Sequence, residues 1–113
     1  MPFREWQRSL QDILQAIIEI QEFVEGLTFE DFQADSKTAK AVLYNFALIG
    51  EAARNIPTEI QSKHRQIPWR LIRDMRNVMI HEYFQVELKR VWITIFQDLP
   101  PLVVKLHQVL ERE

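Results

Sequence analysis

The 113-residue chain lacks cysteine altogether and contains only two glycines. Without cysteine it has no disulfide, zinc knuckle, iron–sulfur cluster or thiol nucleophile. Two glycines and five prolines are too few for a collagen-like repeat, a disordered tail or a sandwich of many tight turns. A glycine-rich phosphate loop and a serine-centred nucleophile elbow are also missing. These absences exclude a P-loop nucleotide hydrolase and leave little support for a cysteine- or serine-based hydrolase.

Long hydrophobic runs are missing as well. No segment approaches the roughly 20 apolar residues that span a bilayer, and the first six residues do not show the apolar core of a signal peptide. A chain that is 47% apolar and 27% charged is expected to form one compact domain over residues 1–113. We therefore expect a soluble, cytoplasmic protein without membrane contact.

Charge is unevenly distributed along the chain. A net charge of −2 argues against sequence-independent binding of nucleic acid along the whole surface, because such binding needs many lysines and arginines that contact phosphates. Residues 61–81, however, carry five basic residues against one acidic residue, whereas residues 1–60 carry five against ten. Such a cluster can receive a phosphate-bearing ligand, although it also fits a solvated helix face. We assign Arg70 and Arg73 of this cluster to substrate binding.

Apolar residues recur at spacings of three and four along most of the chain, which is the pattern of amphipathic helices. No segment shows the alternation of a strand or the turn of a hairpin. Short connections between long helices favour an up-and-down bundle. We therefore predict an all-α fold, a helical bundle with four to five main helices. The long apolar stripes cover residues 6–27, 36–57, 68–81 and 91–109.

Four features in or between these stripes carry further expectations. Gly50 should cost its helix about 1 kcal/mol relative to alanine, so we expect another backbone to approach closely there. Phe23 is expected to widen the first stripe. Thr58 and Gln61 have the spacing of a reciprocal capping box for a short helix. The pair Pro100-Pro101 is expected to kink or divide the last helix.

The helix over residues 68–81 separates into an apolar side and a polar arc. At about 100° per residue, Arg76 and His81 diverge by about 140°, so they grip one atom poorly unless the helix ends near His81. A second copy of the chain would supply the missing partner. Asn77 and His81 do share a face, and Ile80 lies within the polar arc, where it suits a subunit contact.

The polar arc carries the side chains that metal-free RNA cleavage requires. A neutral imidazole accepts a proton from a ribose hydroxyl, and a guanidinium offers paired donors to phosphate oxygens. Burial of an amphipathic helix explains the same pattern, so periodicity alone does not make the arc an active site. A zinc protease is less well supported, because Gln85 stands where its second histidine belongs.

Several segments together resemble the HepT-like toxin family of the HEPN superfamily. Its hallmark is an arginine and a histidine separated by four residues, of which the first is polar. A tyrosine follows two positions after the histidine. The matching segments are Ile67-Pro68-Trp69, Met75-Arg76-Asn77-Val78-Met79-Ile80-His81-Glu82-Tyr83, Gly50-Glu51-Ala52-Ala53 and Asp98-Leu99-Pro100. The resemblance implies a HEPN-like homodimer with a composite ribonuclease cleft. It implies neither a metal nor another cofactor.

The resemblance also assigns roles by position. Arg76 would stabilise the scissile phosphate, Asn77 would position it and His81 would be the acid–base residue. Tyr83 would accept adenylate from a cognate minimal nucleotidyltransferase, the antitoxin of a type VII toxin–antitoxin system. Arg73-Asp74 departs from the family pattern, where a smaller residue, often glycine, is expected.

Three hypotheses remain open at this point. The first is an endoribonuclease toxin acting on RNA. The second is a non-catalytic helical dimer that binds a nucleotidyltransferase partner or a nucleotide. The third is a plain dimerising bundle in which the polar arc is only solvated surface.

Overall fold

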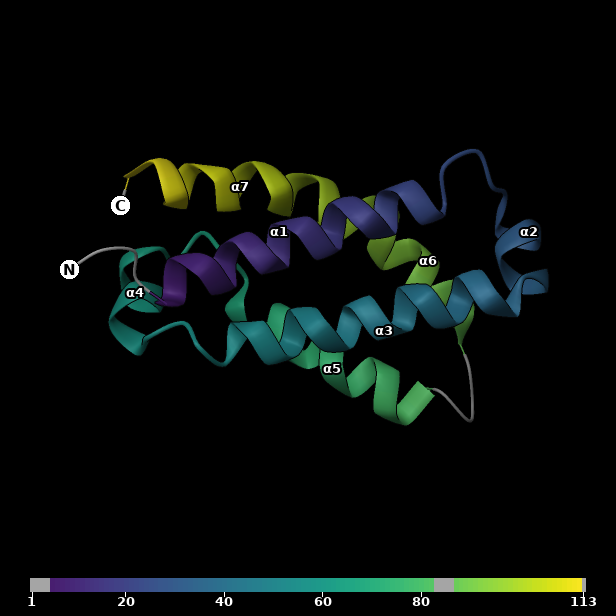
Figure 1. Cartoon of the computed structure of the whole chain (residues 1–113), viewed down its shortest axis with the longest axis horizontal. Coiled ribbons are helices and arrows are strands. Elements are labelled where there is room, and N and C mark those ends of the chain that lie inside the picture. Colours follow the sequence, from purple (N-terminus) through teal and green to yellow (C-terminus); the bar gives the residue numbers. More distant parts are fainter. Residues whose placement is uncertain (1–4, 83–86, 113) are drawn as a thin grey trace.

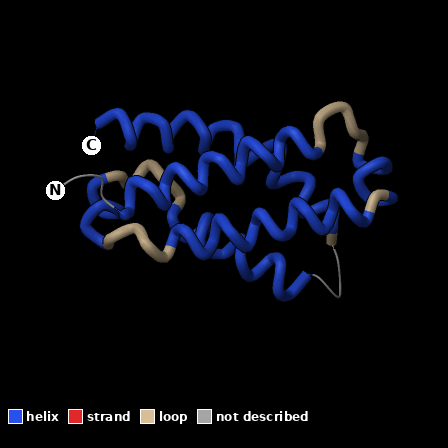
Figure 2. Tube along the Cα trace, viewed as in Figure 1, coloured by secondary structure: helices blue, strands red, loops and turns tan. Residues whose placement is uncertain are grey.

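The computed structural model describes residues 5–82 and 87–112, with the backbone alone for residues 78–82. The described residues form helices and connecting turns, with no strand among them (Figure 2). This confirms the predicted all-α bundle. Four long helices, α1 (Glu5–Phe23), α3 (Ser36–Ala53), α5 (Trp69–Glu82) and α7 (Leu99–Arg112), are joined by α2 (Phe29–Ala34), α4 (Thr58–Lys63), α6 (Leu88–Ile93) and the π-helical turn η1 (Thr94–Asp98).

The long helices lie side by side in the order α7, α1, α3, α5 (Figure 1). Helix α3 therefore has two long neighbours, α1 on one side and α5 on the other. Helix α2 turns the chain at one end of the bundle and α4 turns it at the other end (Figure 1). The bundle is elongated, with principal extents of 47 × 26 × 23 Å. In this arrangement α5 packs mainly against α3.

The core follows the predicted stripes closely. Each buried large apolar side chain contributes roughly 1.5–3 kcal/mol to folding. One expectation is wrong: Phe23 does not widen the stripe of α1, because its side chain is 39% exposed. No helix within residues 5–82 or 87–112 is both long and apolar enough to cross a membrane. The buried apolar residues of α1 and the turn after it are Trp6, Leu10, Ile13, Leu14, Ala16, Ile17, Ile20 and Val24.

Side-chain caps define the starts of α2 and α3. The hydroxyl of Thr28 accepts a hydrogen bond from the Asp31 N–H, and the Asp31 carboxylate accepts one from the Thr28 N–H, both at 3.1 Å. At α3, the Asp35 carboxylate accepts hydrogen bonds from the Thr38 hydroxyl at 2.6 Å and the Thr38 N–H at 3.1 Å. These caps satisfy amides that have no partner within the first helical turn. The start of α3 at Ser36 agrees with the predicted stripe that begins there.

Two other boundaries differ from the simple pattern. The predicted capping box at Thr58 does not form, because Pro57 occupies the cap position and the Gln61 amide donates to the Ile56 carbonyl at 3.0 Å. The prolines at 100 and 101 do interrupt the last helical region, as predicted, but they lie in the first turn of α7. Proline has no N–H to donate. Just before the two prolines the helix forms a wider π turn, in which the Leu99 N–H donates to the carbonyl of Thr94, five residues earlier.

Candidate active site

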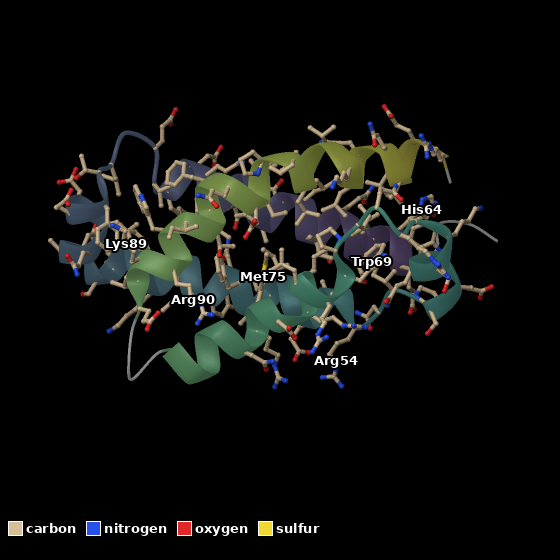
Figure 3. The ribbon with its side chains drawn as sticks, turned by 180° about the vertical axis from the view of Figure 1, so that it is seen from behind. Arg54, His64, Trp69, Met75, Lys89 and Arg90 are labelled. Atoms are coloured by element: carbon tan, nitrogen blue, oxygen red, sulfur yellow. The ribbon has the colours of Figure 1, made fainter. Side chains whose placement is uncertain are left out.

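The start of α5 is anchored to α4 by Trp69. Its side chain is buried, and its indole N–H lies 3.0 Å from the His64 carbonyl and 3.2 Å from the Gln61 carbonyl. Figure 3 shows Trp69 and His64 close together at this end of the bundle. His64 is only 3% exposed, which fits a structural role. The anchor fixes where α5 begins and therefore how it crosses α3.

Helix α5 has one buried and one exposed side, as its periodicity predicts. Ile72 and Met75 are fully buried, and Met75 points into the centre of the bundle (Figure 3). The predicted polar positions up to residue 77 are exposed, namely Arg70, Arg73, Asp74, Arg76 and Asn77. The side chains of Ile80 and His81 lie outside the described ones, and Tyr83 lies outside the described residues.

Gly50 marks the closest approach of α3 and α5. A Cβ atom at this position would lie 2.6 Å from the Cβ of Arg76 and 2.8 Å from its backbone nitrogen. It would also lie 3.1 Å from the Arg73 carbonyl oxygen. Such distances leave no room for a larger residue unless the helices separate. The close backbone contact predicted from Gly50 is therefore confirmed, and it falls on Arg76.

The next residue along α3, Glu51, forms an ion pair with Arg76. The Glu51 Oε1 atom lies 2.8 Å from the Arg76 Nε atom. The same oxygen lies 3.5 Å from the Nη1 atom of Arg54, the residue that follows α3. Both partners of the shorter pair are about half exposed, with side-chain exposures of 45% for Arg76 and 48% for Glu51. Arg76 is therefore held beside α3 while its side chain stays accessible.

Sequence reasoning did not identify this contact. In the sequence, Glu51 stands out only as part of the segment Gly50-Glu51-Ala52-Ala53, with no partner indicated. The sequence nevertheless contains a hint of this contact. Where a glycine allows a second helix to pack closely, the side chain of the next residue lies at the edge of the same contact. Among the side chains that the structure describes, Glu51 is the functional candidate added to the predicted set.

The other two predicted arginines point elsewhere. The Arg73 Nη1 atom lies 3.4 Å from the Gln61 side-chain oxygen on α4. The Arg70 Nε atom lies 4.0 Å from an Asp74 carboxylate oxygen, and the Arg70 side chain is 90% exposed. The structure thus spreads Arg70, Arg73 and Arg76 along one side of α5 without bringing them to one point. They form a cationic strip that can follow a phosphate backbone.

The predicted His81 stands at the far end of α5. Helix α5 includes His81 and ends one residue later, at Glu82, so the helix does end near His81. Positions 76 and 81 both lie within the helix, where ideal geometry separates them by about 140°. His107 is exposed on α7.

An open groove runs between α1 and α3 beside the ion pair. It has a volume of about 600 Å³, and Asp12, Glu19, Glu51 and Arg54 are among the residues that line it. Within the ranges that the structure describes, no three His, Asp or Glu side chains are grouped closely enough to share a metal ion. The groove places carboxylates on the α1 side of Glu51 and the arginines of α5 on the other side.

Comparison with known proteins identifies the family. Residues 13–109 match the family described as "Ribonuclease HepT-like". The chain is 42% identical over 100 residues to a "Probable ribonuclease HepT" of Thermococcus cleftensis, covering 88% of this chain and 91% of the relative. It is 38% identical over 104 residues to a "Putative RNase" of Caldanaerobacter subterraneus, covering 92% and 93%. No solved structure matches it. The chain belongs to the ribonuclease HepT-like family.

Proposed function

We propose that the protein is an endoribonuclease toxin that cleaves RNA without a metal ion at a cleft formed by two copies of the chain. Family membership supports the ribonuclease activity. The single observation that carries the proposal in the structure is Arg76, a half-exposed guanidinium fixed at the crossing of α3 and α5. The cationic strip formed with Arg70 and Arg73 gives an RNA strand a path to it.

The proposed chemistry needs only groups that the chain contains. His81 removes the proton from a ribose 2′-hydroxyl, whose oxygen attacks the adjacent phosphorus while the 5′-oxygen of the next nucleotide leaves and takes up a proton. Arg76 stabilises the negative charge that develops on the phosphoryl oxygens, and Asn77 positions the same group. The products are a cyclic phosphate on one fragment and a free 5′-hydroxyl on the other.

The divergence of positions 76 and 81 supports a composite cleft. Positions 76 and 81 both lie within α5, and an ideal helix separates two such positions by about 140°. A two-fold axis that brings two α5 helices together lets the arginine of one copy meet the histidine of the other. Ile80, predicted within the polar arc, suits such a subunit contact.

We assign neutralisation of the toxin to Tyr83 on the basis of the family resemblance. A cognate minimal nucleotidyltransferase would transfer adenylate from ATP to the Tyr83 hydroxyl with release of pyrophosphate. The added negative charge and bulk would repel and block RNA phosphates beside His81. Growth arrest on expression should be relieved by the nucleotidyltransferase for the wild type and not for Tyr83→Phe. Equal relief of both would contradict this assignment.

Purified variants test the ribonuclease directly. In excess chelator, wild-type protein should cleave RNA, and Arg76→Ala and His81→Ala should each cleave it at least about 100-fold more slowly, because each removes a group that acts in the transition state. His107→Ala is the matched control, since this exposed histidine of α7 has no proposed role, and it should retain full activity. Circular dichroism checks that each variant is folded. Equal cleavage by the wild type and both α5 variants would eliminate the proposed mechanism and favour a non-catalytic dimer.

A further inference from the structure

The contact between Glu51 and Arg76 uses one particular edge of the guanidinium. The closest approach, 2.8 Å, joins a carboxylate oxygen to Nε, the nitrogen nearest the helix. A guanidinium has a second edge, formed by its two terminal nitrogens, which is suited to paired hydrogen bonds with a phosphate. When the Glu51 carboxylate binds at Nε, the edge formed by the two terminal nitrogens therefore points away from the carboxylate.

The contact is poorly explained as a device for stability. Ion pairs between side chains that are about half exposed, as these are, contribute about 0–1 kcal/mol. Gly50, which makes room for Arg76 next to Glu51, costs its helix about 1 kcal/mol relative to alanine. The ion pair and the glycine by themselves thus add little to the free energy of unfolding. What they achieve is a defined place and direction for one guanidinium.

Geometry connects the glycine and the glutamate. The space above Gly50 is filled by the Cβ and backbone nitrogen of Arg76, so the base of the Arg76 side chain rests against α3. Glu51 then contacts the guanidinium of the same side chain at Nε. Two points of contact hold the side chain along its length and reduce the rotamer freedom that a long exposed arginine otherwise keeps.

We propose that Glu51 is a positioning residue of the ribonuclease: it orients Arg76 through Nε so that the two terminal nitrogens meet the scissile phosphate. The proposal rests on the ribonuclease function proposed above. Preorganised donors aimed at developing charge act mainly in the transition state. Loss of Glu51 should therefore lower kcat while KM for RNA changes little. It should act only through an arginine, since a lysine at 76 offers no Nε edge.

The test compares Glu51→Ala and Glu51→Gln with the surface control Glu59→Ala on α4. Glu51→Ala should lower kcat about 10-fold or more with KM within about twofold. Glu51→Gln keeps an oxygen that accepts from Nε, so it should retain an intermediate rate, and Glu59→Ala should match the wild type. In an Arg76→Lys background, Glu51→Ala should lower the rate no further.

Several outcomes would overturn the proposal. One is an unchanged or increased kcat for Glu51→Ala. Another is an equal loss of rate in the Arg76→Lys background, which would show that Glu51 acts by another route. Because wild-type protein is assayed in parallel, an inactive wild type contradicts the ribonuclease itself, whereas an active wild type with an unaffected Glu51→Ala contradicts only the role of Glu51.

Discussion

Helix α3 contacts its two long neighbours in opposite ways. Toward α1 it presents Asn45, whose buried amide donates to the Ala16 carbonyl at 3.1 Å and to the Glu19 carboxylate at 2.9 Å. Toward α5 it presents Gly50, with no side chain, followed by Glu51 in a half-exposed ion pair with Arg76. One contact ties a polar group into the core, and the other holds a charged group at the surface.

This difference separates stability from activity. A buried hydrogen-bonded amide is destabilising to remove, because its partners lose their bonds where water reaches them poorly. A half-exposed ion pair contributes little to stability, but it fixes the direction of a side chain. We therefore expect changes on the α1 side to alter the free energy of unfolding, and changes to charged groups on the α5 side to alter catalysis. Gly50 is the exception, since backbone packing is involved there.

Gly50→Ala should have the largest effect on the comparison, because it separates α3 from α5. Helix propensity alone predicts a gain of about 1 kcal/mol, whereas overpacking against the Arg76 backbone predicts a loss of about 1–3 kcal/mol. Urea unfolding of both proteins measures the difference. We expect a loss accompanied by reduced RNA cleavage, and a more stable Gly50→Ala protein would show that the helices do not pack as described.

Asn45→Ala tests the opposite side of α3. Removing the buried amide should lower the free energy of unfolding by about 1–3 kcal/mol. Cleavage of RNA per folded molecule should stay at the wild-type level, since Asn45 faces α1 and not α5. A protein of unchanged stability, or one that is folded but inactive, would break the proposed division between the two sides.

Arg73→Ala sharpens the distinction within α5 itself. Its guanidinium reaches toward Gln61 on α4 and not toward Glu51, so we expect it to bind the RNA backbone without acting on the reacting phosphate. Binding should weaken severalfold, and the slope of log K against log salt should fall by about 1. The kcat should remain near that of the wild type. A loss of kcat as large as that of Arg76→Ala would place Arg73 in the reaction as well.

Asp35→Ala is expected to have the smallest effect on stability. It serves as a baseline, because Asp35 caps the start of α3 away from the contacts at Asn45 and Gly50. Hydrogen bonds from the Thr38 hydroxyl and N–H lower the pKa of the Asp35 carboxyl. Because the folded-state pKa is depressed, the cap stabilises α3 fully above the unfolded-state pKa and loses this contribution as pH falls through the folded-state value. Asp35→Ala should melt slightly below the wild type at neutral pH, and the two melting temperatures should converge in acid. A constant difference down to the lowest pH would contradict this role.

The sequence predicts the helices well because burial of an apolar stripe leaves a direct periodic record. It also predicts the close contact at Gly50, since an interior glycine needs a reason. Gln61 shows the limit: its spacing from Thr58 is that of a capping box, yet its amide bonds the Ile56 carbonyl after the chain turns. Phe23 likewise has the right residue type but lies off the buried stripe.

The site is less accessible to sequence reasoning than the fold. Glu51 and Arg76 are 25 positions apart in the sequence, and their ion pair depends on where the two helices that carry them cross. Periodicity within either helix does not contain that information. In the proposed mechanism, the meeting of Arg76 with His81 would depend in turn on a second copy of the chain. Local patterns identify the chemical groups, and only the packing of helices and subunits decides which of them meet.

The composite cleft is tested most directly by mixing two inactive proteins. Arg76→Ala and His81→Ala are co-refolded in equal amounts, and RNA cleavage is compared with that of each variant alone. If arginine and histidine come from different copies, half of the dimers regain one intact cleft of two, and activity should return to about a quarter of the wild-type value. A mixture that forms mixed dimers yet stays as inactive as its components would contradict the shared cleft.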